Sequence, residues 1–207
     1  MQKIFYVLLV ALFIIACDDK PKETGVGNKA ASADTSTQIT EAVVISVTDK
    51  NDIDTIKKSI KAHAVNKVND TRFTIEYHSP AVRNRIIWGG LVPFDQVWVT
   101  GAHMATSLEV DKPFVLNKLE IPAGKYALFT IPSNKEWIVI INKNWQQHLA
   151  DKYNQSEDVT RFYVKPDSLD YTQERLRYVI DQKGEGFGAI EMSWEKLKIS
   201  IPFALKK

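Results

Sequence analysis

Alternation of apolar and polar residues is the feature that most limits how this chain can fold. It runs through three stretches, whose apolar members are Phe73, Ile75 and Tyr77; Leu176, Tyr178 and Ile180; and Leu197, Ile199 and Ile201. A period of two places alternate side chains on one face of a β-strand, so each stretch predicts a half-buried strand. Residues 137–141 are apolar at every position, which is typical of a strand covered on both faces.

Turn-forming residues separate these stretches at short intervals, at 69–70, 89–90, 111–113, 122–124, 132–134 and 184–188. Many short strands at such spacing predict an all-β domain, an antiparallel β-sandwich of jelly-roll type, with a partly closed barrel as the alternative. One short helix is expected at 144–153, where Trp145, Leu149 and Tyr153 share helical spacing after a candidate N-cap, Asn144.

The N-terminus has the pattern of a bacterial lipoprotein signal. Lys3 precedes an apolar run at 4–15, and Ala16 and then Cys17, the single cysteine of the chain, follow it. The run is shorter than the roughly 20 residues that a membrane-spanning helix needs, so it fits the apolar core of a signal peptide. A small residue followed by cysteine resembles the site at which such proteins are lipidated and cleaved. A plain signal peptide with an incidental cysteine is the alternative.

The resulting prediction is a signal peptide at 1–16, a lipidated N-terminus and flexible tether at 17–58, and a folded domain at 59–207. Residues 20–40 are polar and lack aromatic side chains, so they cannot bury enough surface to offset their ordering entropy. Residues 41–58 could extend the tether or pack on the domain. Acyl chains on Cys17, such as palmitate, would hold the protein on a membrane of the cell envelope. Asp18 and Asp19 do not decide between the periplasm and the cell surface.

Charge and cysteine content exclude some classes of protein. The formal net charge is +2, and removal of the signal peptide takes away one lysine and no acidic residue. A near-neutral domain argues against nucleic acid as a partner. With its one cysteine lipidated, the chain has no disulfide, and stability must come from a packed core.

Several unusual strings occur in an order that resembles domain-of-unknown-function family 2911, a bacterial family. They are IIWGGLVPF at 86–94, VWVTGAHMAT at 97–106, PAGKY at 122–126 and FTIP at 129–132, with Trp194-Glu195-Lys196 near the end. The resemblance covers roughly 60–203 and implies an exported envelope protein with a mainly β fold, but no established activity. The commoner form of the second string has Arg, Asn and Glu where this chain has Val99, His103 and Met104, so no role of those residues transfers.

Candidate ligand-binding residues cluster near the family strings: His78, Arg83, Trp98, Thr100 and His103. Arg83 and the nearby Arg85 could clamp an anionic group. The glycine after Thr100 would let the chain turn sharply and direct His103 outward. The imidazoles of His78, His103 and His148 suit copper or zinc, although none of their spacings is a tight ligand motif.

Each candidate also has an ordinary interpretation. A histidine on a strand's polar face or in a turn is most often solvated, and an arginine beside a turn is most often hydrated or paired. The five tryptophans are more simply explained by core packing than by ligand stacking.

Three functions remain open, and the first is preferred. It is a lipid-anchored binding or accessory module for an envelope partner or small ligand. The second is a metal-handling protein that uses His78 and His103 to bind copper or zinc, and these two metals are the candidate cofactors. The third is a hydrolase of envelope glycans or peptides, which would need two carboxylates, or a carboxylate and a histidine, in one pocket. Motifs of a serine nucleophile elbow, a phosphate-binding loop and a zinc protease are missing, so the sequence does not favour an enzyme.

Replacing Cys17 with serine tests the lipid anchor. Because serine offers no thiol for a thioether, Cys17→Ser is expected to leave the protein unlipidated and to release it from the membrane fraction after export. Fractionation of the source cells with quantitative immunoblotting measures this. Wild-type amounts of Cys17→Ser protein in the membrane fraction would refute lipid attachment at this residue.

Overall fold

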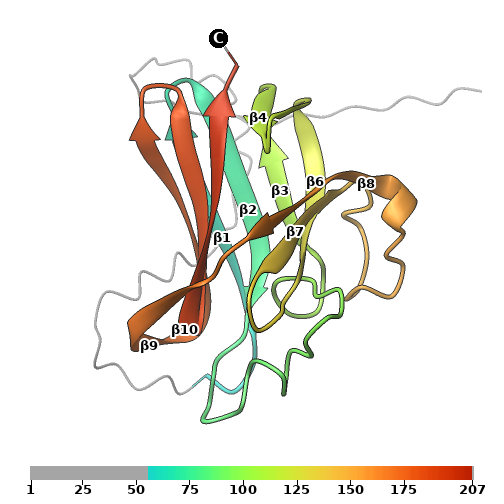
Figure 1. Ribbon diagram of the computed structural model, residues 1–207, viewed down its shortest axis with the longest axis vertical. Helices are drawn as coiled ribbons and strands as arrows, with labels where there is room; N and C mark the ends of the chain where they lie inside the picture. The colour runs from blue at the N-terminus through green and yellow to red at the C-terminus, as the bar shows by residue number, and fades with distance from the viewer. Residues whose placement is uncertain (1–55, 207) are drawn as a thin grey trace, which may run out of the picture. The chain divides into compact units, whose positions relative to one another are not determined.

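The structure, a computed structural model, describes residues 56–206 and is all-β in that range (Figure 1). Ten strands and one short 3₁₀ turn, Gln155–Glu157, make up its regular structure. The strands are β1 (Ile60–Val68), β2 (Thr71–Ser79), β3 (Thr106–Val110), β4 (Phe114–Leu116), β5 (Leu119–Ile121), β6 (Gly124–Ile131), β7 (Trp137–Asn142), β8 (Asp158–Val164), β9 (Asp167–Gly184) and β10 (Phe187–Leu205).

Two antiparallel sheets form a sandwich, which confirms the predicted fold class. One sheet has the order β1-β2-β3-β6-β7-β8 and the other the order β5-β4-β10-β9. The sheets do not join into a closed barrel. The long hairpin of β9 and β10, orange to red in Figure 1, provides most of the second sheet.

The core lies between the sheets and contains the apolar residues that alternate in the sequence. Phe73, Ile75 and Tyr77 of β2 are buried, whereas the residues between them are partly exposed. The ring of Phe73 stacks on Phe203 of β10 with centroids 4.3 Å apart. Burying such side chains between the two layers supplies most of the drive to fold.

β7 is apolar at both parities because both of its faces are covered. Trp137, Val139 and Ile141 face the central core, whereas Ile140 belongs to a second cluster with Phe129 on the outer side. The connection between β7 and β8 covers this cluster with Trp145 and Tyr153. The expectation of a doubly covered strand is confirmed.

The predicted helix at 144–153 is wrong. This segment is an irregular connection whose main chain pairs with the loop before β3: Leu149 N–H donates to His103 C=O (2.6 Å), and Ala105 N–H donates to Gln147 C=O (2.9 Å). Leu149 also has a φ of 49°, which an α-helix cannot contain. Trp145 and Tyr153 share one face, as expected, but tertiary pairing rather than helical hydrogen bonding places them there.

The signal peptide, Cys17 and residues 17–55 of the expected tether lie outside the described residues. The described part of the chain contains no helix long and apolar enough to cross a membrane. Residues 56–59 precede β1, and two arginines hold their main chain. The guanidinium of Arg175 donates to the carbonyls of Ile56 (2.9 Å) and Lys58 (3.3 Å), and that of Arg83 donates to those of Ile56 and Lys57.

A buried tyrosine links the β9–β10 sheet to the loop before β3. The hydroxyl of Tyr178, on β9, donates to the carbonyl of Thr100 at 2.8 Å. The ring of Tyr178 packs edge-on against Tyr77 of β2, with centroids 4.8 Å apart. Full burial raises the pKa of Tyr178 well above its ordinary value, so the hydroxyl keeps its proton and can donate at neutral pH.

Replacing Tyr178 with phenylalanine tests this link. Tyr178→Phe keeps the ring but leaves the buried Thr100 carbonyl with one fewer donor, so the free energy of unfolding is expected to fall by about 1–2 kcal/mol. Urea denaturation measures the change. Tyr163→Phe, at a ring that is 69% exposed, is the control and should change stability little. Equal denaturation midpoints for the wild type and Tyr178→Phe would show that the bond contributes nothing.

Candidate ligand-binding cavity

The long connection between β2 and β3, residues 80–105, builds the candidate site at one end of the sandwich (green in Figure 1). Main-chain pairing fixes it at three places. Ala81 pairs with Arg175 of β9, Trp98 pairs with Thr130 of β6, and Met104 pairs with His148. A connection held in this way can present side chains as rigidly as a strand does.

A bend at Thr100 and Gly101 is the most tightly held part of this connection. The Thr100 carbonyl accepts from the hydroxyls of Tyr178 and Thr106, and the indole N–H of Trp98 donates to the Gly101 carbonyl at 3.1 Å. Glycine is needed at 101 for space, because a Cβ there would lie 2.8 Å from Thr106 Oγ1. Thr100 itself is fully buried, so it positions the loop and does not face a ligand.

Several residues at this end of the sandwich, near the Thr100 bend, have left-handed backbone conformations. Arg83, Thr100, His103 and Leu149 have φ between 49° and 61° although none is glycine. Such conformations cost free energy, most of all for a β-branched residue such as threonine, and they persist where the surrounding structure enforces them. Strain of this kind is concentrated at functional sites, which makes this end of the sandwich the first place to look for one.

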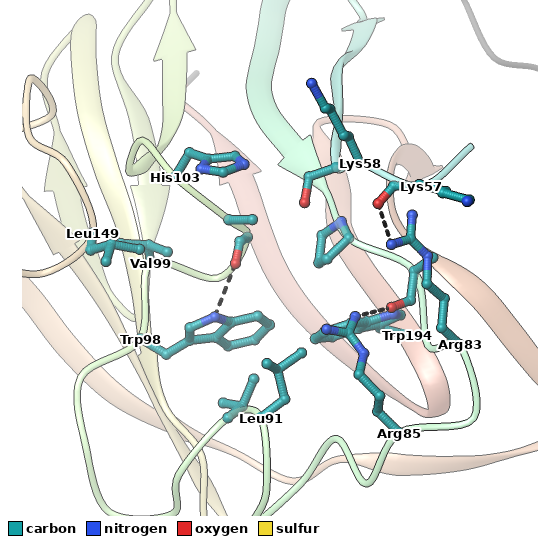
Figure 2. Close-up of a pocket in the computed structure, with 16 residues that line it drawn as sticks. Lys57, Lys58, Arg83, Arg85, Leu91, Trp98, Val99, His103, Leu149 and Trp194 are labelled. Carbon is teal, nitrogen blue, oxygen red and sulfur yellow. Dashed lines mark hydrogen bonds between the residues drawn. The ribbon is translucent and has the colours of Figure 1, made fainter.

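A cavity of about 770 Å³ opens at this end of the sandwich (Figure 2). The segment before β1, the β2–β3 connection, the β7–β8 connection and β10 all contribute to its walls. Its volume lies within the usual range of small-molecule sites. The residues that line it are Lys57, Lys58, Ser59, Pro80, Ala81, Arg83, Arg85, Leu91, Val92, Trp98, Val99, Gly101, Ala102, His103, Leu149 and Trp194.

Two tryptophans form the aromatic part of the lining. The rings of Trp98 and Trp194 are nearly parallel, at 19°, with centroids 5.9 Å apart, and Trp88 packs edge-on against both. Trp194 lies where the register of β10 shifts against β9, a bulge that redirects a side chain. The Nε1 of Trp194 is buried and finds no hydrogen-bond partner among the described residues. Buried indole donors without an acceptor are rare in folded proteins, so this one marks an unusual point in the wall of the cavity.

Basic side chains occupy the opposite part of the lining. Arg83 and Arg85 extend along the right side of the cavity in Figure 2, whereas the main chain of Lys57 and Lys58 borders it and their side chains point outward. Within residues 56–206 none of the four forms an ion pair. Arg85 instead donates to the carbonyls of Ala81 and Val82. The nearest acidic contact is Glu174, whose carboxylate accepts from the main-chain N–H of Arg83 and not from its guanidinium. The lining contains no aspartate or glutamate.

His78 and His103 meet beside the cavity. Their ring centroids are 5.3 Å apart and the rings are nearly perpendicular. In the described residues, however, no group of three histidine, cysteine, aspartate or glutamate side chains is arranged to hold a metal ion. His148 does not complete such a group, and its ring contacts Asp151 at 3.4 Å. The expected three-histidine set is therefore reduced to a pair.

The structure thus brings together part of the set that the sequence suggests. Arg83, Trp98 and His103 line the cavity. The ring of His78 packs against that of His103 but does not line the cavity, and Thr100 is buried in the supporting bend. Sequence reasoning missed other lining residues, namely Lys57, Lys58, Leu91 and Trp194. The two adjacent lysines, which lie at the end of the predicted tether, are the visible signal for the first two. Nothing in one sequence signals that Trp194, which follows Trp98 by 96 residues, packs against it.

The chain belongs to the family described as Protein of unknown function (DUF2911), which it matches over residues 59–203. This range covers more than half of the chain and includes the β2–β3 connection and Trp194. It confirms the resemblance seen in the sequence and carries no assigned activity. No match was found among curated proteins or among solved structures.

The histidine pair predicts a pH dependence of stability. Partial burial, then the charges of His103 and Lys61, lower the pKa of His78 from its ordinary value near 6.5. The unfolded chain therefore binds a proton at His78 more readily than the folded protein, so stability is expected to fall as the pH drops below about 6.5.

Urea denaturation between pH 7.5 and 5 measures this effect. His78→Gln should lose less stability over the interval than the wild type does, because its folded and unfolded states no longer differ in proton binding at this position. Parallel pH profiles for His78→Gln and the wild type would contradict the assignment.

Proposed function

We propose that this protein is a lipid-anchored protein of the bacterial cell envelope that binds a small ligand in the cavity between the β2–β3 connection and β10. One observation carries the proposal: a cavity of about 770 Å³ whose lining is mostly apolar and includes a few converging polar groups. This is the usual composition of a small-molecule site.

Rigidity of the cavity walls supports binding as the function. The Thr100 bend, the Trp98–Thr130 pairing and the Leu149–His103 hydrogen bond fix three of the walls before a ligand arrives. A preformed site loses little conformational freedom on binding, so a larger part of the contact energy appears as affinity.

The N-terminal sequence supports the location. A signal-like apolar run at 4–15 that ends at the single cysteine, Cys17, suits a protein attached to the membrane by acyl chains and facing the periplasm or the cell surface. The proposed partners are this membrane and the ligand of the cavity.

Metal handling is a second candidate, favoured by the 5.3 Å approach of the His78 and His103 rings. Two imidazoles could both ligate one copper or zinc ion, but stable protein sites for these metals usually take three or four protein ligands. A hydrolase finds less support, since the cavity lining offers no carboxylate.

Filling the cavity tests the proposed function. Ala102 lines the cavity, so Ala102→Phe should occupy part of its volume, whereas Ala123→Phe in the exposed turn before β6 should not. We expect a compound screen by thermal shift to find ligands that stabilise the wild type and Ala123→Phe by several degrees but leave Ala102→Phe unchanged. A ligand at about one hundred times its Kd contributes roughly 2.7 kcal/mol to stability, which is enough for such a shift.

The same screen separates the two candidates. Copper and zinc salts are included, with His103→Ala as the control for the histidine pair. Stabilisation by a metal that His103→Ala abolishes would favour metal handling. Organic compounds that act equally on the wild type and Ala102→Phe, or no active compound among acids, bases and neutral molecules, would contradict ligand binding in the cavity.

A further inference from the structure

We infer that the ligand of the cavity is an amphiphilic anion: a carboxylate or phosphate monoester carried on an apolar body. This inference rests on the proposed function and names the chemical class of its ligand. Its anionic group lies at the basic side of the cavity, and its apolar body lies against the tryptophans and the aliphatic residues opposite.

The distribution of charge supports an anionic group. The guanidinium groups of Arg83 and Arg85 lie beside the cavity, and the exposed Lys57 and Lys58 add positive charge at its rim (Figure 2). Within residues 56–206 none of the four has an ion-pair partner. Elsewhere in the same range, Lys112, Lys125 and Lys183 each pair with a nearby carboxylate. Like charges brought together repel each other, so a bound anion would relieve the repulsion and gain charge-assisted hydrogen bonds.

The two arginines are oriented for this role. The guanidinium of Arg83 is held by the carbonyls of residues 56 and 57, and that of Arg85 by those of residues 81 and 82. A guanidinium has five N–H donors, and these contacts leave donors free in each group. Fixed arginines with unused donors can bind a carboxylate or phosphate without first losing side-chain entropy.

Lys57 and Lys58 add charge without a structural role of their own. Their side chains are exposed and make no hydrogen bond or ion pair within the described residues. Their main chain, by contrast, is held against the cavity by Arg83 and Arg175. The lysine charges can therefore be removed with little effect on the fold.

The remaining lining supports an apolar body. Leu91 and Leu149 are exposed to the cavity, and the nearly buried Val92, Val99 and Trp194 lie beneath it. The cavity is larger than an inorganic phosphate needs. A neutral sugar fits less well, because apart from the cations the lining offers few side-chain polar groups, namely the Ser59 hydroxyl, the His103 ring and the indoles. An apolar body buried there gains hydrophobic free energy in proportion to its area.

Matched ligands with one body and different heads test the inference. The chain from Asp18 to Lys207, which keeps every described residue and avoids detergent, is titrated calorimetrically with decanoate, 1-decanol, decyltrimethylammonium and inorganic phosphate. All four are used as monomers at low salt. We expect decanoate to bind at least roughly tenfold more tightly than 1-decanol, because a carboxylate forms charge-assisted hydrogen bonds with the arginines that a hydroxyl cannot form. Decyltrimethylammonium and phosphate should bind more weakly still.

Charge removal provides the matched variants. Lys57→Gln combined with Lys58→Gln should weaken decanoate binding several-fold at low salt and leave 1-decanol binding unchanged. Lys67→Gln combined with Lys118→Gln removes the same charge away from the cavity and should change neither.

The other outcomes overturn the inference in distinguishable ways. Equal binding of 1-decanol and decanoate would refute the anionic group, and equal binding of phosphate and decanoate would refute the apolar body; the proposed function survives both. Sedimentation with phosphatidylglycerol vesicles, without decanoate binding, would identify an anionic bilayer instead. Failure of all probes to bind refutes the amphiphilic anion, and the compound screen with Ala102→Phe then decides the proposed function.

Discussion

The hydrogen bond from the Tyr178 hydroxyl to the Thr100 carbonyl is the constraint on which the candidate site depends. It joins the β9–β10 sheet to a fully buried bend that has a left-handed conformation at threonine. Trp98 precedes this bend and His103 follows it, and the Trp98 indole is tied back to the Gly101 carbonyl. Because the two sheets are separate layers, this bond also sets where the β2–β3 connection lies relative to Trp194 on β10. The cavity thus results from how the sandwich closes at one end, and it is not a property of a single loop.

The short segment before β1 both anchors the arginines beside the cavity and contributes to the lining of the cavity. Its carbonyls accept from Arg83 and Arg175, and its main chain borders the cavity while the lysine side chains extend outward in Figure 2. Arginine donors that hold main-chain carbonyls keep their positive charge, whereas pairing with a carboxylate would neutralise it locally. The basic character of the cavity therefore follows from the way this segment is attached.

Much of the fold could be predicted because alternation is a local signal. Phe73, Ile75 and Tyr77 show which face of β2 is buried, and the continuous apolar run at 137–141 shows that β7 is covered twice. The helix expected at 144–153 failed because helical spacing of Trp145, Leu149 and Tyr153 also suits an irregular cover over an outer cluster, and main-chain pairing with residues 103–105 decides between them. The site was only partly predictable. Arg83, Trp98 and His103 lie in one stretch of sequence, whereas Trp194 joins them through sheet packing, and Thr100 turned out to support the site and not to face it.

The central claim is that a ligand enters between Trp98 and Trp194 on one side and the basic residues on the other. The most direct test is a two-dimensional ¹H–¹⁵N NMR spectrum of the five indole N–H groups during titration with decanoate. Our account predicts shifts of the Trp194 resonance, whose N–H has no partner among the described residues, and of Trp98. The resonance of Trp145, whose ring packs under Lys125 and does not line the cavity, should not shift and serves as the control for nonspecific effects. Unchanged Trp98 and Trp194 resonances at saturating decanoate, or equal shifts of Trp145, would contradict the account.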